Sequence, residues 1–260
     1  MLNYDIRSVS LGHEKIRCEC FFVKYDKRGF IRLNFISSVK NLNKGERILW
    51  ISSLAVIIVA FTVFGGGSVL SLIVSLIGAT ALIFVGKGDP IGQLFTIIFA
   101  VIYSLVSLKF RYYGEMITYA GMSLPSAFVA MVIWLKNPYS AHEVKVSTMT
   151  GKKWAVLAIL TIVVTTLFYF ILSALNTANI LFSTLSVATS FFASMLTIFR
   201  SPYYAVAYSF NDVVLIVLWV LATIENPAYF CMVICFVIFL ISDTYGFINW
   251  QRLRKKQAEK

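Results

Sequence analysis

The sequence predicts an all-α membrane protein with about eight transmembrane helices: an N-terminal accessory helix, then two parallel three-helix repeats with one linker helix between them. Hydrophobic residues make up 59% of the 260 residues and charged residues only 13%, whereas about 25% of a soluble domain is charged. Eight apolar runs are long enough to cross a bilayer. The basic residues fall between alternate runs, which sets the direction of each helix.

Each apolar run has roughly the 17–25 residues that a transmembrane helix needs, and short polar or glycine-containing segments separate most of the runs. The first run ends at the tight turn Gly65-Gly66-Gly67. The predicted spans are, in chain order, Ile48–Phe64, Val69–Val85, Ile91–Leu108, Met116–Leu135, Trp154–Leu175, Phe182–Phe199, Tyr203–Ala222 and Ala228–Ile248.

The basic residues predict the topology. With eight spans both termini lie on the same side of the membrane, and the opposite side holds only Lys109 and Arg111. By the positive-inside rule the termini are cytoplasmic. The net charge of +11 therefore indicates topology and contact with the lipid surface rather than a nucleic-acid partner. The side of the termini holds 21 of the 23 Lys and Arg residues: ten before Trp50, Lys87, four from Lys136 to Lys153, Arg200 and five after Trp250.

Helix count and direction divide the chain into six parts. The single linker helix gives the two repeats the same orientation, so an axis along the membrane normal would relate them. The parts are a basic cytoplasmic or interfacial N-terminal region (1–47), an accessory transmembrane helix (48–67), a first three-helix repeat (68–136), a cytoplasmic loop with the linker helix (137–181), a second three-helix repeat (182–250) and a basic cytoplasmic tail (251–260).

Short sequence matches support the two repeats. A basic residue and a proline precede the middle helix of each repeat, in Lys87-Gly-Asp-Pro90 and in Arg200-Ser-Pro202. The third helix of each repeat begins with Tyr-x-x-Met and ends on Trp. Both of these features are 116 residues apart, with Tyr113 and Trp134 matching Tyr229 and Trp250.

The N-terminal region has two open interpretations. Within Phe30–Leu42 the apolar side chains Ile31, Phe35, Val39 and Leu42 recur at helical spacing, which predicts an amphipathic helix on the inner leaflet. A partly disordered basic tail fits the composition equally well.

The cysteines give no firm site. Cys18 and Cys20 with His13 are a weak metal-binding pattern, because no second ligand pair accompanies them. Cys231 and Cys235, one helical turn apart, are predicted to be small apolar packing residues. We therefore predict neither a metal nor a cofactor.

Two carboxylates lie well inside hydrophobic runs. Asp212 follows Asn211 in the middle of the seventh span, and Asp243 lies toward the inner end of the eighth. A charge near the bilayer centre costs about 2.5–3.5 kcal/mol on insertion scales, so it usually faces a polar cavity or a partner. No Lys or Arg lies within a span to pair with Asp212. We predict that these carboxylates hold a substrate; the alternative is that they satisfy backbone groups or fix helix contacts.

Aromatic residues on the seventh span suit an organic cation, through charge pairing with the carboxylate and contact with ring faces. Trp50, Trp134, Trp154 and Trp250 lie at predicted membrane borders and are interpreted as interfacial belt residues. Glu115 has the alternative role of capping its helix. The predicted substrate-binding residues are Gln93, Glu115, Tyr119, Tyr204, Tyr208, Asn211, Asp212, Trp219, Asp243 and Asn249, with Tyr203 as a further aromatic neighbour.

Other classes of function have little support in the sequence. We find no nucleophile with an acid–base partner within a span, and no glycine-rich phosphate loop after a strand, so we do not predict an enzyme. A repeated filter segment or ring-forming charges, which are typical of channels, are not apparent either. A membrane adaptor or sensor that uses the basic N-terminal region is the alternative of a different class.

Three stretches resemble the PnuC family of nicotinamide riboside transporters, in its Gram-positive form, and the resemblance covers residues 68–250. They are Gly86-Lys-Gly-Asp-Pro-Ile-Gly-Gln-Leu through Phe110-Arg-Tyr-Tyr-Gly-Glu-Met-Ile-Thr-Tyr119, Arg200-Ser-Pro-Tyr-Tyr-Ala-Val-Ala-Tyr-Ser-Phe-Asn-Asp-Val-Val214, and Tyr245-Gly-Phe-Ile-Asn-Trp250.

The resemblance implies a three-plus-one-plus-three helix core like that of the SWEET sugar transporters, assembled as a homo-oligomer that is often a trimer. It also implies a bacterial inner or plasma membrane, and facilitated diffusion of nicotinamide riboside that phosphorylation traps inside the cell. Asp212 would then balance the pyridinium charge, while Asn211, Gln93 and Tyr119 contact the ribose hydroxyls. A thiamine-transporting branch of the same family is the alternative, since thiamine is also a cation with an aromatic ring.

Overall fold

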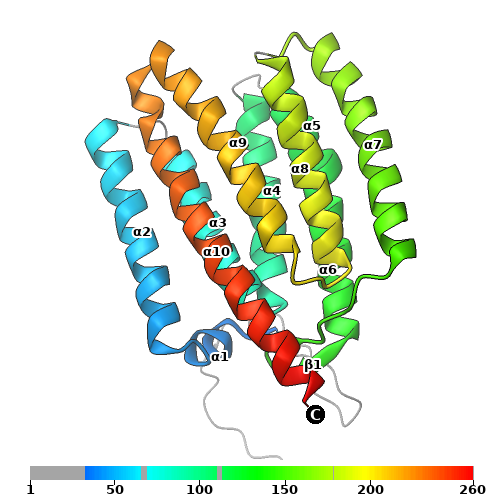
Figure 1. The fold of residues 1–260 in the computed structure, drawn as a ribbon. Helices are drawn as coiled ribbons and strands as arrows, with labels where there is room; N and C mark the ends of the chain where they lie inside the picture. The colour runs from blue at the N-terminus through cyan, green and yellow to red at the C-terminus, as the bar shows by residue number, and fades with distance from the viewer. Residues whose placement is uncertain (1–32, 66–68, 110–112, 178, 260) are drawn as a thin grey trace, which may run out of the picture.

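Long helices that run side by side make up almost all of the structure (Figure 1). The computed structural model describes residues 33–65, 69–109, 113–177 and 179–259. Its elements are α1 (Phe35–Lys40), α2 (Lys44–Phe64), α3 (Val69–Lys87), α4 (Ile91–Lys109), α5 (Tyr113–Thr118), the π-helix η1 (Tyr119–Ser123), α6 (Leu124–Lys136), β1 (Pro138–Ser140), β2 (Glu143–Val144), α7 (Gly151–Ala174), α8 (Ile180–Ile198), α9 (Tyr204–Glu225), the short η2 (Pro227–Tyr229) and α10 (Phe230–Ala258).

Every predicted span forms a helix, or the joined helices α5, η1 and α6. Over the described residues, seven helical segments are long and apolar enough to cross a membrane. The remaining predicted span forms α4, which has a shorter apolar stretch, Ile91–Leu105. This helix nevertheless has 19 residues, like its neighbour α3, and packs along it. The expected all-α membrane fold is confirmed.

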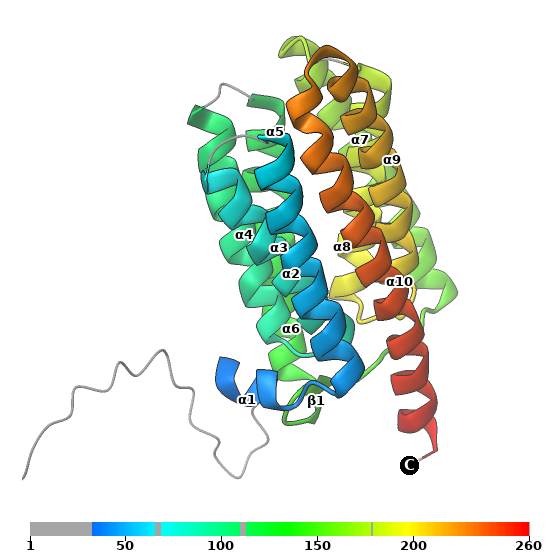
Figure 2. The same ribbon diagram turned by 90° about the vertical axis from the view of Figure 1, so that its left-hand side faces the viewer.

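Two groups of three helices meet face to face (Figure 2). One group is α3, α4 and α6, and the other is α8, α9 and α10. They touch where α10 packs against α3 and where α6 packs against α8. The α3–α10 crossing is close because two glycines face each other there: a Cβ built on Gly86 would lie 3.3 Å from the Cα of Gly246.

The turns that enter α4 and α9 have the same backbone hydrogen bonds. Gly88 (φ 82°) and Arg200 (φ 56°) both adopt the left-handed region, and each is followed by a polar residue and a proline. In the first turn the bonds run from the amides of Gly88, Asp89 and Gly92 to the carbonyls of Val85, Phe84 and Asp89. In the second they run from the amides of Arg200, Ser201 and Tyr204 to the carbonyls of Thr197, Leu196 and Ser201, in each case 112 residues further on.

Two tryptophans link these turns across the groups. Trp134 at the end of α6 donates from Nε1 to the carbonyl of Thr197 (2.9 Å), and Trp250 on α10 donates to the carbonyl of Val85 (3.0 Å). Their rings lie 5.3 Å apart, and both side chains are fully buried. The interpretation of Trp134 and Trp250 as belt residues was therefore wrong. Each ring is enclosed between the two groups, whereas Trp154 is 38% exposed, as a belt residue would be.

The reciprocal bonds give a matched pair of predictions. Trp134→Phe and Trp250→Phe should each lower stability by about 2–3 kcal/mol, because each loses a hydrogen bond and leaves a cavity where the larger ring was fully buried. The hydrogen-bond part of the cost stays modest because each carbonyl keeps its bond from the turn amide, Arg200 for Thr197 and Gly88 for Val85. Melting temperatures in detergent should fall by similar amounts for both variants. A large drop for one alone would contradict the equivalent roles of the two rings.

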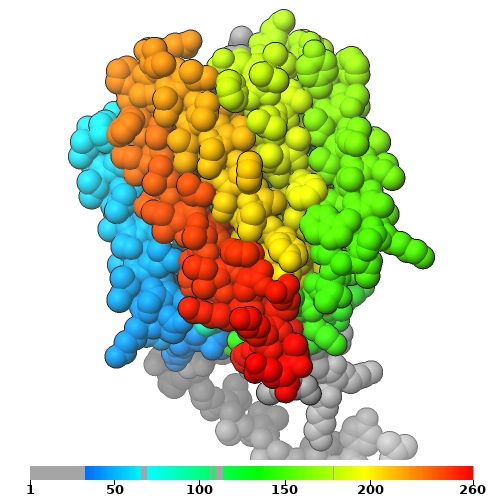
Figure 3. Space-filling model, viewed as in Figure 1, coloured from blue at the N-terminus to red at the C-terminus, as the bar shows by residue number. Residues whose placement is uncertain are grey.

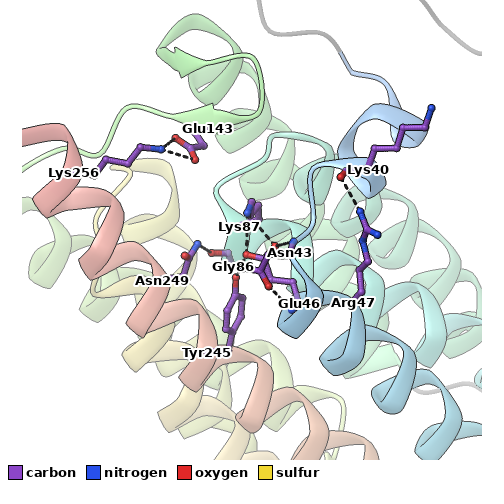
Figure 4. A network of polar contacts seen from close by, with 10 residues as sticks. All are labelled: Lys40, Asn43, Glu46, Arg47, Gly86, Lys87, Glu143, Tyr245, Asn249 and Lys256. Atoms are coloured by element: carbon purple, nitrogen blue, oxygen red, sulfur yellow. Dashed lines mark hydrogen bonds and ion pairs between the residues drawn. The ribbon is translucent and has the colours of Figure 1, made fainter.

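The accessory helix α2 is held by a buried ion pair (Figure 4). Asn43 and Glu46 form a capping box at its start, and the side chain of Glu46 is almost fully buried. Lys87 at the end of α3 donates to both carboxylate oxygens of Glu46 at 3.0 Å, and the hydroxyl of Tyr245 on α10 donates to Oε1 at 2.5 Å. These contacts join α2 to α3 and α10.

The short helix α1 covers the basic end of the bundle. Ser38 donates to Oδ2 of Asp89 at 2.6 Å, and His142 from the β1–β2 hairpin contacts the same oxygen at 3.0 Å. Phe35 packs edge-on against Trp50, and Leu42 is buried. The predicted amphipathic helix is therefore helical over Phe35–Lys40, while Ile31 lies outside the described residues, as do His13, Cys18 and Cys20.

The predicted basic tail continues α10 as helix to Ala258. Its end holds the β1–β2 hairpin, because Gln257 bonds the backbone of Val144 and Val146, and Lys256 pairs with Glu143. In Figure 1 this end of the bundle carries α1, the hairpin and the C-terminus together. The described parts of the chain that are predicted to be cytoplasmic thus lie at one end.

Candidate functional site

A cavity of about 130 Å³ lies between the two groups of helices. Its walls come from α3, α4, η1, α6, α8, α9 and α10; of the described residues, none from α2 or α7 lines it. A single water needs about 10–15 Å³ measured in this way, so the cavity has room for a small organic molecule. Seven of the predicted substrate-binding residues line it: Gln93, Tyr119, Tyr204, Tyr208, Asn211, Asp212 and Asp243.

One face of α9 supplies most of the polar wall. Tyr204, Tyr208 and Asp212 follow one another at steps of four residues, and Asn211 and Leu215 each lie three residues from one of them, so all five project from the same side of the helix. Pro202 lies just before this helix, so its lack of a backbone N–H removes no hydrogen bond from the helix. The local sequence therefore presents these side chains to the cavity together.

The carboxyl groups of Asp212 on α9 and Asp243 on α10 belong to the same cavity wall. The two residues are 4% and 3% exposed. Oδ2 of Asp212 is buried and has no hydrogen-bond partner among the described residues. The cavity walls, as far as the structure describes them, include no Lys or Arg. Two acidic groups without a basic partner favour a cationic ligand.

The amide of Asn211 is oriented by hydroxyl groups behind it. Its Oδ1 accepts hydrogen bonds from Ser186 (3.3 Å) and Thr189 (2.9 Å) on α8. With the oxygen occupied in this way, the NH₂ group is the free donor of the side chain. The hydroxyl of Tyr208 forms a hydrogen bond with that of Ser194 at 2.9 Å. These contacts fix the polar groups before a ligand arrives, which lowers the entropic cost of binding.

Aromatic rings form another part of the wall. The ring centroids of Tyr119 and Phe99 lie 5.7 Å apart, and those of Phe236 and Phe239 lie 5.5 Å apart. All four side chains line the cavity. Rings around an acidic pair provide electron-rich faces for a flat organic cation.

The π-helix η1 sets the position of Tyr119. Pro125, near the start of α6, lacks the N–H that would bond to the carbonyl four residues before it, and its ring crowds that carbonyl. The chain widens there into π turns, with the amide of Leu124 bonded to the carbonyl of Tyr119. Such single π turns within helices frequently occur at functional sites.

Three predicted binding residues lie outside the cavity. Glu115 accepts a hydrogen bond from Tyr103 at 3.0 Å, beyond the aromatic wall. Trp219 stacks against Phe236 in an apolar cluster, more than one helical turn beyond Leu215. Asn249 donates to the carbonyl of Gly86 at 2.9 Å and so satisfies a free carbonyl at the end of α3. Each of the three stabilises helix contacts in this structure. Tyr203 also points elsewhere and lines a groove on the outer surface.

Several hydroxyl-bearing residues of the cavity were not predicted. Those on α8 recur at steps of four and three residues, a spacing that marks one helix face and was available in the sequence. However, Ser and Thr are common in transmembrane helices, where their hydroxyl groups often bond to a carbonyl of the preceding turn. A row of them in the sequence therefore does not by itself indicate a binding site. The residues that were not predicted are Thr96 on α4, Ser123 at the end of η1, Ser126 on α6, and Ser190, Ser194 and Thr197 on α8.

Comparison with known proteins identifies the family. The profile of the family described as nicotinamide mononucleotide transporter matches residues 68–252. The chain belongs to this family. The matched segment contains every described residue that lines the cavity and excludes α2. The resemblance predicted from the sequence motifs is confirmed, and the protein is a multi-pass membrane transporter.

Two relatives in this family are named nicotinamide riboside transporter PnuC. The protein from Neisseria mucosa is 28% identical over 202 residues, which are 75% of this chain and 77% of the relative. The protein from Haemophilus influenzae is 28% identical over 190 residues, which are 72% of this chain and 81% of the relative. The crystal structure of the vitamin B3 transporter PnuC matches with a TM-score of 0.71 and 27% identity, over 84% of this chain and 94% of that one.

Proposed function

We propose that this transporter carries nicotinamide riboside through the membrane and that the cavity between α4 and α9 is its binding site. The observation that carries the proposal is the acidic pair Asp212 and Asp243, which lies in an aromatic-walled cavity without a described Lys or Arg. Nicotinamide riboside has a fixed pyridinium charge that this pair would balance. The names of the two relatives support the same substrate.

The remaining walls suit the uncharged parts of the substrate. The pyridinium ring would lie between Tyr119, Tyr208 and the carboxyl groups, where ring faces and negative charge act together. The ribose hydroxyls would bond to the amides of Asn211 and Gln93, which line the cavity from α9 and α4. Asp212 and Asn211 lie on adjacent positions, so one helix would hold both the charge and the sugar.

The mechanism we propose is facilitated diffusion. The two helix groups would move against each other around the cavity, opening it first to one side of the membrane and then to the other. Phosphorylation of the vitamin inside the cell would keep the gradient inward. In this proposal the basic end, with both termini, faces the cytoplasm, and the positive-inside rule supports that direction. A homo-oligomer, often a trimer in this family by the resemblance noted above, is part of the same proposal.

Uptake into reconstituted vesicles tests the function. Purified protein in vesicles should admit labelled nicotinamide riboside down its gradient without an added ion gradient, and Asp212→Asn should abolish this uptake. Deleting residues 1–32 should leave uptake intact, whereas an adaptor that works through its basic N-terminal region would lose its function. A longer deletion is unsuitable, because Ser38 and Leu42 are buried against the bundle.

Nicotinamide mononucleotide should bind more weakly than the riboside. Its phosphate brings negative charge toward Asp212 and Asp243, and two unit charges about 8 Å apart repel by about 2 kcal/mol at an effective dielectric constant of 20. That corresponds to roughly a 30-fold higher Kd. Competition against labelled nicotinamide riboside measures the ratio. Equal or tighter binding of the mononucleotide would contradict the charge argument.

A further inference from the structure

A second hollow lies on the outside of the bundle, between α7 and α9. It is a groove of about 490 Å³ whose floor is α8. The small side chains of Ala188 and Ala207 leave it open, while Trp154, Phe192 and Phe210 form its walls. Figure 3 shows this face of the molecule, with α7 in green beside the yellow of α8 and α9.

The groove is an apolar surface open to the bilayer. Val206 is 40% exposed and Phe210 is 68% exposed. The hydroxyl of Thr161 donates to the carbonyl of Leu157 at 2.8 Å, and the hydroxyl of Thr189 donates to Oδ1 of Asn211 at 2.9 Å, so both threonines in the lining use their protons within the protein. The groove spans about two helical turns, from Tyr203 to Phe210, which is roughly 10 Å along the helix axis. This length and polarity match a segment of an alkyl chain.

One end of the groove is aromatic and basic. The rings of Trp154 and Tyr203 lie 6.2 Å apart there. Lys153 precedes Trp154, and Arg200 lies in the turn between the groove residues Leu196 and Tyr203. The loop before α7 joins the two basic residues: Nζ of Lys153 donates to the hydroxyl of Ser147 at 2.9 Å, and the amide of Ser147 donates to the carbonyl of Arg200 at 3.0 Å.

Arg200 occupies a backbone position that favours glycine. Its φ of 56° lies in the left-handed region, and the equivalent turn of the other helix group has Gly88 with a φ of 82°. A side chain other than glycine, asparagine or aspartate is uncommon there. The second turn therefore retains an arginine between the groove residues Leu196 and Tyr203 despite the conformational cost. The first turn, with the same hydrogen bonds, has no side chain at that position.

The guanidinium is not fully paired. One of its terminal nitrogens donates to the carbonyl of Lys145 at 3.1 Å, but the buried Nε has no partner among the described residues. Partial burial lowers the pKa of Arg200, which means that the charged form has lost favourable hydration. An anion at this position would restore the lost interaction.

We propose that the groove binds one anionic phospholipid, with an acyl chain between α7 and α9 and the phosphate at Arg200 and Lys153. Trp154 and Tyr203 would lie at the level of the headgroup, where such rings concentrate. Lys152, two residues before Trp154, is exposed and adds a third positive charge to this part of the chain. Basic residues at this end match the acidic headgroup, whereas a zwitterionic lipid would gain much less from them.

The groove and the cavity lie on opposite sides of the same helix. Val206 and Phe210 of α9 face the groove, while Tyr208 and Asn211 face the cavity. Thr189 lines the groove and donates to Oδ1 of Asn211 at 2.9 Å. A lipid in the groove would thus touch the side chain that orients the amide of Asn211. The proposed lipid site can be tested by lipid binding in the absence of substrate, so the outcome does not depend on the proposed substrate.

Native mass spectrometry of the full-length protein tests the site. The protein in detergent is titrated with phosphatidylglycerol or with phosphatidylcholine that has the same acyl chains, and the complexes are then released from detergent in the mass spectrometer. One phosphatidylglycerol per chain should be retained preferentially. Arg200→Gln and Lys153→Gln should each weaken its retention by roughly fivefold, while Lys255→Gln, the same charge change on an exposed residue of α10, should leave it unchanged.

Substitutions in the apolar part test the acyl-chain position independently. Val206→Trp fills the groove and should abolish preferential retention; Val213→Trp, the same change at an exposed site on α9 outside the groove, should not. Equal retention of both lipids, or wild-type retention by Val206→Trp, would overturn the proposal. Competition by glycerol phosphate would overturn it in favour of a free-phosphate site. If the wild type retained no lipid and Val206→Trp lost an oligomer that the wild type forms, the proposal would be overturned, and the groove would be an interface between copies of this chain.

Discussion

Asp212→Asn should weaken the binding of nicotinamide riboside at least about 30-fold, because it removes a buried charge and keeps the shape of the side chain. Loss of one partner from a buried charge pair costs roughly 2–5 kcal/mol, and each 1.4 kcal/mol is a tenfold change in Kd. The residue is 4% exposed and Oδ2 has no bond to the described parts of the chain, so few internal contacts are lost. Binding of labelled substrate to purified protein measures the effect.

A neutral analogue separates charge from shape. Dihydronicotinamide riboside lacks the pyridinium charge, so wild type and Asp212→Asn should bind it with similar, weak affinity. Asp243→Asn should also weaken binding of the cation, since its carboxyl group faces the same space. Unchanged affinity of Asp212→Asn for nicotinamide riboside would assign this carboxylate a structural role.

Glu46→Ala should cost about 3–5 kcal/mol of stability, the range for breaking a buried ion pair by removal of one partner. Glu46 is 2% exposed and accepts hydrogen bonds from Lys87, Tyr245 and the amide of Asn43. Its loss would leave the ammonium of Lys87, whose side chain is 15% exposed, without a counter-charge and would remove the capping box of α2. The melting temperature in detergent should fall by on the order of 10 °C.

The double variant Glu46→Met with Lys87→Met is the control. Replacing both charges by apolar groups of similar size is often neutral or stabilising, so it should recover most of the stability lost in Glu46→Ala. Substrate binding should persist in the double variant, because α2 contributes no described residue to the cavity. If Glu46→Ala alone melted like the wild type, the ion pair would not be what fixes α2.

The sequence alone predicts the features that depend on local pattern. Apolar run length and the spacing of basic residues predict each helix, and the carboxylates of Asp212 and Asp243 stand out because a charge inside a span is costly. Both line the cavity, as do five further predicted residues. The packing role of Cys231 and Cys235 is also confirmed, since both are buried in an apolar cluster.

Features that depend on contacts between distant helices were not predicted. Trp134 and Trp250 stand near the ends of spans, where belt residues occur, and only the meeting of the two helix groups encloses them. Asn249 is polar and directly follows the eighth predicted span, but its carbonyl partner, Gly86, lies 163 residues away in the chain. The position of Tyr119 depends on the π turns before Pro125, which a regular helical wheel does not represent.

Calorimetric titration of the purified full-length protein with nicotinamide riboside tests whether the acidic cavity binds this cation. We expect saturable binding to the wild type, weaker binding of thiamine, and a loss of at least about 30-fold in Asp212→Asn. Binding of thiamine without binding of nicotinamide riboside would contradict the proposed substrate, and binding that is unaffected in Asp212→Asn and Asp243→Asn would contradict the proposed site.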